Sequence, residues 1–188
     1  MKKIILILTI LISTGSLYSG FAQSDIFLKN RIFAEGLYIR NLGEFGSVWS
    51  SAAGGYLGYG IAFPEHNYLM LRSGVISNKL KDDVNFEDAN MTMIPVELGG
   101  RYYFNDNILM PFVQFMTGLN LVFESENLVG ENENTTLVKY TWQVGLGLTV
   151  NILSNISMDV GVNYQSNFFD NEAMNTGFEY NAGFGFAL

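Results

Sequence analysis

The last thirteen residues, Thr176 to Leu188, read TGFEYNAGFGFAL and alternate between two kinds of side chain. Gly, Glu, Asn and Ala occupy the odd positions after Thr176. Successive side chains of a β-strand point to opposite faces, so this period of two predicts a strand with one apolar face and one small or polar face. The even positions after Thr176 carry Phe178, Tyr180, Ala182, Phe184, Phe186 and Leu188.

The same alternation recurs along most of the chain. Four upstream segments show it clearly: 91–104, 108–123, 137–151 and 156–166. Three earlier segments, 32–40, 49–63 and 68–77, are strand-like but leave open which face is apolar. Together with the C-terminal segment they predict eight strands, which are separated in sequence by turn-forming or polar residues.

The gaps between these strands alternate in length. Short gaps fall at 64–66, 105–107 and 152–155, whereas longer gaps fall at 41–48, 78–90, 124–136 and 167–175. The longer gaps hold eleven acidic and two basic residues. Short turns on one side and long loops on the other are typical of outer-membrane barrels. The sequence therefore predicts an all-β fold, an eight-stranded antiparallel up-and-down transmembrane β-barrel with long acidic loops outside the cell.

The N-terminus has the features of a secretory signal. Met1-Lys2-Lys3 is basic, residues 4–17 are mainly apolar, and Gly20-Phe21-Ala22 places small residues before a cleavage site. We expect a signal peptide at 1–23 and a barrel domain at 24–188. Its removal takes away two lysines and no acids, so the formal charge falls from −8 to −10. The chain has no Cys, which excludes a lipoprotein anchor and disulfides.

Two features favour a barrel whose apolar face meets lipid. The opposite face is rich in Gly, Thr, Asn and Gln and poor in charge, unlike the outer face of a soluble barrel. Aromatic residues also gather at both strand ends, as at two membrane interfaces. One belt comprises Phe63, Tyr102, Phe104, Phe112 and Phe186 near the short gaps, and the other Trp49, Phe123, Tyr140, Phe168 and Phe178 near the long gaps.

The few charges on the polar face are candidates for the lumen. Isolated charges in a narrow interior are costly, so we expect them to pair, with Glu35 and Arg72 joining them. These charges form either a structural ion-pair network that plugs the barrel, or a selectivity constriction or small-molecule site. The lumen candidates are Glu97, Arg101, Lys139, Asp159 and Glu179. The lipid-facing and assembly-signal candidates are Trp142, Phe178, Tyr180, Phe184, Phe186 and Leu188.

One run carries a family resemblance. Residues 94–104, IPVELGGRYYF, precede a short turn and then Met110-Pro111-Phe112-Val113. This pattern resembles the paired strands of small outer-membrane barrels of Bacteroidota, the PorT-like or porin-family barrels of the OmpA type. The resemblance implies an outer-membrane barrel and says little about function. Such barrels often end in Phe, which the barrel-assembly machinery is thought to read, whereas this chain ends in Leu188.

The charge and the motifs of the sequence argue against several classes of function. The acidic charge argues against a nucleic-acid partner. The single His66 falls in a predicted short turn, and no catalytic, cofactor or metal motif is present, so we expect no enzyme activity and no cofactor. The main hypothesis is a structural or surface-interaction barrel with a plugged lumen. Its expected partners are outer-membrane lipid, the assembly machinery and an unidentified surface or periplasmic protein. The alternatives are a small channel or transporter for polar or lipophilic solutes and a secreted lipocalin-like barrel that binds a ligand.

Overall fold

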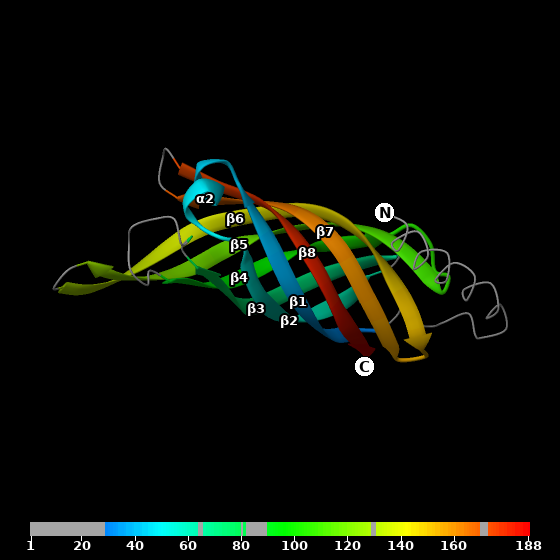
Figure 1. Ribbon diagram of the computed structural model, residues 1–188. Coiled ribbons are helices and arrows are strands. Elements are labelled where there is room, and N and C mark those ends of the chain that lie inside the picture. The colour runs from blue at the N-terminus through cyan, green and yellow to red at the C-terminus, as the bar shows by residue number, and fades with distance from the viewer. Residues whose placement is uncertain (1–28, 64–65, 80, 82–89, 129–130, 170–172) are drawn as a thin grey trace.

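The computed structural model describes residues 29–63, 66–79, 81, 90–128, 131–169 and 173–188. The predicted signal peptide, residues 1–23, and the start of the predicted barrel domain, 24–28, lie outside the described residues. The described chain forms one closed barrel of antiparallel strands (Figure 1). No helix in these ranges is long and apolar enough to cross a membrane.

Eight strands follow one another around the barrel in sequence order. The predicted all-β, eight-stranded, antiparallel up-and-down barrel is therefore confirmed. The barrel closes where the first strand pairs with the last, from Arg31 opposite Ala187 to Leu42 opposite Thr176. The strands are β1 Arg31–Leu42, β2 Ala52–Phe63, β3 Asn67–Lys79, β4 Asn90–Tyr103, β5 Leu109–Leu128, β6 Glu131–Leu153, β7 Ile156–Phe169 and β8 Ala173–Ala187.

The period of two in the sequence becomes an inside and an outside. Odd-numbered residues of β1 face inward, and even-numbered residues of β2 and β3 do so, which settles the faces that the sequence leaves open. Large apolar side chains are exposed on the outward face of all eight strands; Leu57 on β2 is 68% exposed and Leu146 on β6 is 65% exposed. Such a continuous apolar exterior is unfavourable in water and suits hydrocarbon.

The strand connections gather at two ends of the barrel, which we name by their length. At the turn end lie His66 before β3, the connections at 104–108 and 154–155, and the C-terminus (Figure 1). At the loop end, the β1–β2 connection contains the short helix α2, Gly43–Val48, and the β3–β4 connection covers 80–89. Short turns alternate with longer loops over this half of the chain, as predicted.

Two predicted long loops are wrong. The gap predicted at 124–136 shrinks to two residues, because β5 continues to Leu128 and β6 begins at Glu131. The gap predicted at 167–175 shrinks to three, because β7 continues to Phe169 and β8 begins at Ala173. Strand pairing uses backbone groups, so polar residues extend a ladder without the apolar alternation from which the strand ends were predicted.

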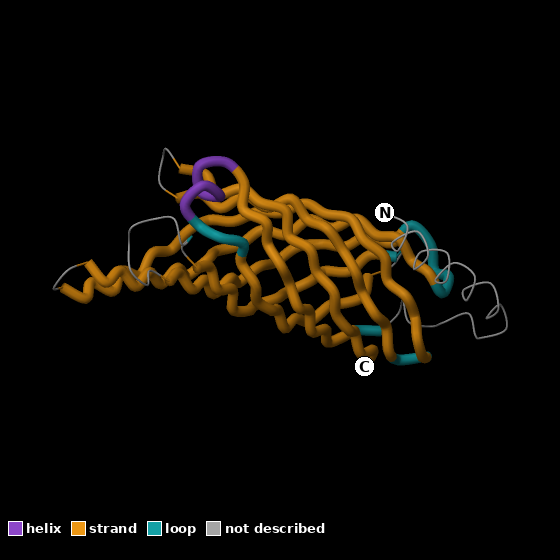
Figure 2. Tube along the Cα trace, in the orientation of Figure 1, coloured by secondary structure: helices purple, strands orange, loops and turns teal. Residues whose placement is uncertain are grey.

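The extended β5–β6 hairpin projects beyond the rest of the loop end (Figure 2). Its pairs run to Leu128 opposite Glu131, whereas β4 pairs with β5 only as far as Ser125 and β7 pairs with β6 only from Tyr140. The outer part of the hairpin therefore pairs only with itself.

Candidate functional site

The barrel interior holds a layer of buried charges. Four basic and four acidic side chains are each less than a tenth exposed, so the layer is formally neutral. Neutrality lowers the cost of burial only where each charge also meets a partner at close range. The eight residues are Arg31, Glu35, Arg72, Glu97, Arg101, Lys139, Asp159 and Glu179.

Arg72 on β3 joins three carboxylates. Its Nε lies 2.7 Å from Glu97 on β4, its Nη1 lies 3.1 Å from Glu35 on β1, and its Nη2 lies 3.6 Å from Glu179 on β8. The guanidinium also stacks over the Tyr56 ring at 3.8 Å, a cation–π geometry. Arg72 therefore links four strands, β1, β3, β4 and β8, through charge, and it contacts a fifth strand, β2, through Tyr56.

Arg101 on β4 extends the layer toward the turn end. Its Nη1 lies 2.5 Å from Asp159 on β7 and its Nη2 lies 3.4 Å from Glu35. Both Nε and Nη2 donate to the Gln114 amide oxygen, at 3.0 and 2.8 Å. The guanidinium lies over the Phe112 ring at 4.0 Å. Since Glu35 serves both arginines, the two clusters form one network.

Arg31, the first residue of β1, completes this network at the turn end. Its Nη2 lies 3.1 Å from Asp159 and donates a hydrogen bond to the Tyr103 hydroxyl. Its guanidinium carbon lies 5.1 Å from the Tyr68 ring centre and 5.6 Å from that of Tyr103. Asp159 also accepts from Thr149 Oγ1 at 2.7 Å.

Side-chain amides satisfy the remaining carboxylate oxygens. Gln143 Nε2 donates to Glu97 at 2.9 and 3.0 Å, and Asn163 Nδ2 donates to Glu179 at 2.7 Å. Gln114 Nε2 in turn donates to Asn163 at 2.8 Å. Amides from β5, β6 and β7 thus bind charges that come mainly from β1, β3, β4 and β8. The arrangement is that of a connected structural network, in which Arg72 Nη2 and Gln143 Oε1 are buried without a hydrogen-bond partner among the described residues.

Apolar clusters close the lumen on both sides of the charges. The turn-end cluster comprises Phe33, Tyr68, Met70, Tyr103, Met110, Phe112 and Met116. The loop-end cluster comprises Leu37, Ile39, Ala52, Tyr56, Ile76, Met91, Met93 and Val122. Inward glycines make room for this packing: a Cβ on Gly145 would lie 1.7 Å from Asn163 Oδ1, and one on Gly161 would lie 2.6 Å from Asn181 Oδ1. Side chains therefore occupy the lumen of the described barrel.

The structure places the five predicted lumen residues inside the barrel. Glu97, Arg101, Asp159 and Glu179 belong to the network built on the three arginines. Lys139 is also buried but lies nearer the loop end, opposite Asn120 of β5. Arg31 is missed by the sequence reasoning, although its odd-numbered spacing from Phe33 and Glu35 would have placed it on the same face.

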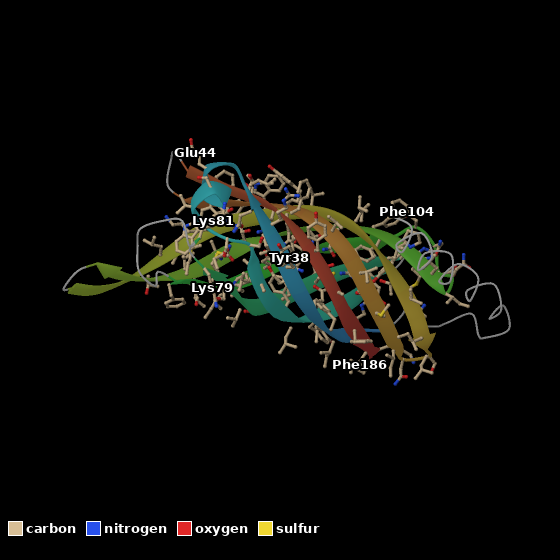
Figure 3. All side chains as sticks on the ribbon, viewed as in Figure 1. Tyr38, Glu44, Lys79, Lys81, Phe104 and Phe186 are labelled. Carbon is tan, nitrogen blue, oxygen red and sulfur yellow. The ribbon has the colours of Figure 1, made fainter. Side chains whose placement is uncertain are left out.

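The predicted outward residues separate into two groups. Phe178, Tyr180, Phe184, Phe186 and Leu188 are exposed on or just beyond β8, and Trp142 is half-buried beside Tyr164, with ring centres 6.0 Å apart. Figure 3 shows Phe104 and Phe186 at the turn end, away from Glu44, Lys79 and Lys81 at the loop end.

Two aromatic residues placed in the predicted belts lie elsewhere. Phe112 is buried in the lumen, because its outward neighbours Pro111 and Val113 leave it on the inner face. Trp49 stacks on Phe45 of α2 at 6.0 Å, and both pack against the loop-end cluster. The helix turns the chain inward there, which no strand periodicity could predict.

The structure offers no arrangement that suggests catalysis in the residues it describes. His66 lies in the β2–β3 turn with a positive φ of 68°, and its carbonyl accepts from the Tyr103 amide at 3.0 Å. No group of three or more His, Asp or Glu side chains in the described ranges could hold a metal ion.

No protein-family model matches the sequence, and no curated protein matches it either. Solved structures do match. Neisserial surface protein A, NspA, superposes with a TM-score of 0.58 at 17% identity, over 85% of this chain and 97% of that one. Ail, the attachment invasion locus protein of Yersinia pestis, superposes with a TM-score of 0.53 at 16% identity, over 85% of this chain and 99% of that one. OprG, an outer membrane protein of Pseudomonas aeruginosa, superposes with a TM-score of 0.53 at 12% identity, over 85% of this chain and 96% of that one. This chain therefore has the fold of small eight-stranded outer-membrane β-barrels.

Proposed function

We propose that this protein is an integral outer-membrane barrel with a structural or surface-interaction role and no enzyme activity. One observation carries the proposal: all eight strands present apolar side chains outward, around a lumen filled by a neutral ion-pair layer between two apolar clusters. The outer surface suits lipid, and the filled lumen leaves the loop end as the part able to meet partners. A lipocalin-like barrel needs the opposite placement of charge, with apolar residues facing a ligand inside.

The resemblance of residues 94–113 to PorT-like barrels of Bacteroidota belongs to the same proposal, as do the signal peptide at 1–23 and recognition by the assembly machinery. NspA is named a surface protein and Ail an attachment protein, and a surface role for this chain extends those names by analogy of fold alone. The hairpin that projects from the loop end supports such a role, because it carries paired backbone beyond the barrel wall.

A channel is the second candidate. It is favoured by the uneven lining of the lumen, which is apolar on one side and polar on the other. The apolar members of both clusters come from β1–β5, whereas the buried residues of β6, β7 and β8 are polar or glycine. Planar-bilayer recording of the refolded chain separates the two candidates. Silence from inserted protein is the expected result, since Arg72 and its carboxylates block the lumen. Discrete conductance steps that change in Glu97→Gln or Glu179→Gln would establish the channel instead.

The absence of Cys from the chain allows a direct test of location and orientation. Glu44→Cys lies in α2 at the loop end, and Asn107→Cys lies in the β4–β5 turn at the opposite end; both positions are exposed. In intact cells, a membrane-impermeant maleimide should label Glu44→Cys and leave Asn107→Cys unlabelled. Both should be labelled once the outer membrane is permeabilised.

The two variants act as controls for each other. Labelling of Asn107→Cys alone in intact cells would show that the turn end, and not the loop end, faces the outside of the cell. Equal labelling of both, or recovery of the chain in the soluble fraction, would contradict an integral outer-membrane protein.

A further inference from the structure

The outward aromatic residues at the loop end do not encircle the barrel. Exposed aromatic side chains lie there on β1, β5, β6, β7 and β8: Tyr38, Phe123, Tyr140, Phe168 and Phe178. Just before β2, and on β2, β3 and β4, the outward positions at this end hold small, hydroxyl or cationic residues instead: Ser51, Ala53, Ser77, Lys79 and Thr92. One sector of the rim therefore offers hydrogen bonds and charge where the rest offers aromatic rings.

The strand register brings two cations together in this sector. Ile39 pairs with Ala52, so the next outward residue of β1, Arg40, lies opposite Ser51. The Ser50 amide donates to the Lys79 carbonyl at 2.8 Å, which places Lys79 on the other side of Ser51. Adjacent strands lie about 4.8 Å apart, so the Arg40 and Lys79 backbones are separated by roughly 10 Å. Both side chains are exposed and long enough to reach one shared group.

Neither cation forms an ion pair within the described residues. Inside the barrel, by contrast, Arg31, Arg72 and Arg101 all do. The nearby Lys81 is engaged with α2, because its Nζ donates to the Gly46 carbonyl at 2.6 Å. Among the described residues of this sector, Arg40 and Lys79 thus present cationic charge without an ion pair, in a chain whose formal charge is −8.

The sector lies at the depth of lipid headgroups. Tyr38 is one outward position nearer the barrel centre than Arg40, and its ring centre lies 6.4 Å from that of Tyr180. Its hydroxyl donates to Ser51 Oγ at 2.7 Å. Tyrosines of this kind mark the boundary between hydrocarbon and headgroups. Figure 3 shows Lys79 farther toward the loop end than Tyr38.

We propose that Arg40, Ser51 and Lys79 form a binding site for the phosphate of a glycolipid in the outer leaflet. The inference rests on the proposed location and orientation of the barrel. Two cations and a hydroxyl suit phosphate oxygens, since charge-assisted hydrogen bonds are the stronger ones. Ser77 and Thr92 lie in the same sector and add hydroxyl groups suited to sugar oxygens.

The test is native mass spectrometry of the full chain refolded in detergent and titrated with three lipids: phosphorylated lipid A, lipid A without phosphate, and phosphatidylglycerol. Phosphorylated lipid A should bind most tightly. Lys79→Gln should weaken this binding about tenfold, and Arg40→Gln with Lys79→Gln should weaken it further. The matched control is Lys29→Gln, the same substitution at an exposed position of the turn end, which should bind as the unmodified chain does.

Equal binding by Lys79→Gln and Lys29→Gln would overturn the site. Equal binding of the phosphate-free lipid A would overturn the phosphate assignment, and equal binding of phosphatidylglycerol would overturn the glycolipid assignment. The heat-dependent electrophoretic shift, measured on the same samples, reports folding of the barrel in detergent. Folded protein without this selectivity refutes only the lipid site, whereas a chain that does not fold as a barrel in detergent contradicts the proposed function.

Discussion

At the scale of single residues, Arg72 has the densest set of charged contacts described in the lumen. It meets Glu35, Glu97 and Glu179 from three other strands and lies against Tyr56. Substituting an ion that is buried among partners costs more than its own interactions are worth, because the partners stay buried and uncompensated. The stability of the barrel therefore depends on Arg72 through the three carboxylates that it neutralises.

Arg72→Met should lower the free energy of unfolding by about 3–5 kcal/mol. Urea titration in neutral phosphatidylcholine vesicles, followed by the heat-dependent electrophoretic shift, measures the change. Arg40→Met is the matched control, and it should have little effect in this lipid because Arg40 faces outward without an ion pair in the described residues. Adding Glu179→Gln to Arg72→Met should cost less than the sum of the single changes. Additive costs would mean that the two side chains do not interact.

Single residues also show which lumen positions the alternation of side chains could predict and which it could not. Clear alternation on β4, β6, β7 and β8 placed Glu97, Lys139, Asp159 and Glu179 on the polar face, and the structure has them inside. On β1 the inward face mixes Arg31 and Glu35 with apolar residues, so neither face of the sequence stands out. The partners of each charge could not be predicted, because they come from strands far apart in the chain and depend on register.

At the scale of elements, the β5–β6 hairpin and helix α2 depart most from expectation. Both lie at the loop end, where the chain leaves the lipid-facing wall and the apolar alternation stops. The barrel strands were predictable because lipid on one side and a packed lumen on the other impose a period of two. The outer part of the hairpin pairs only with itself and lines no lumen, so its strands are not held to a period of two.

Shortening this hairpin should leave the barrel intact. Ser125 lies opposite Asn134, so residues 126–133 can be replaced by Asn-Gly, a two-residue turn suited to antiparallel strands. The removed backbone pairs only within the hairpin, so the free energy of unfolding should change by no more than about 0.5 kcal/mol. Urea titration in vesicles measures it. A larger loss would show that the hairpin packs against other loop-end segments and supports the barrel.

At the scale of the whole molecule, the outward apolar surface separates a membrane barrel from a soluble one. Leu57 lies near the middle of β2 and is among the most exposed apolar side chains. In lipid, Leu57→Lys should destabilise the folded barrel by about 2–4 kcal/mol. In a soluble barrel, the same change on an exposed position would be nearly neutral.

The control for this change is Asn107→Lys, an exposed position in the β4–β5 turn, which should have little effect. Unfolding of both variants in vesicles of one composition gives the comparison. Similar small effects at both positions would contradict a lipid-facing β2. The overall fold was predictable at this scale because the count of strands and their alternation apply to the entire chain, whereas the identity of a surface partner leaves no comparable periodic mark.

The closure of the barrel by β1 and β8 has a consequence for the order of assembly. Arg31 pairs with Ala187, so β1 is synthesised first but can form the backbone hydrogen bonds of its second edge only after β8 has been synthesised. Until then the chain has two open edges, which hydrocarbon does not tolerate. Contacts of such long sequence separation form slowly. A chain that stops before β8 should therefore yield no smaller barrel, but an unfinished sheet retained by chaperones or degraded by proteases in the periplasm.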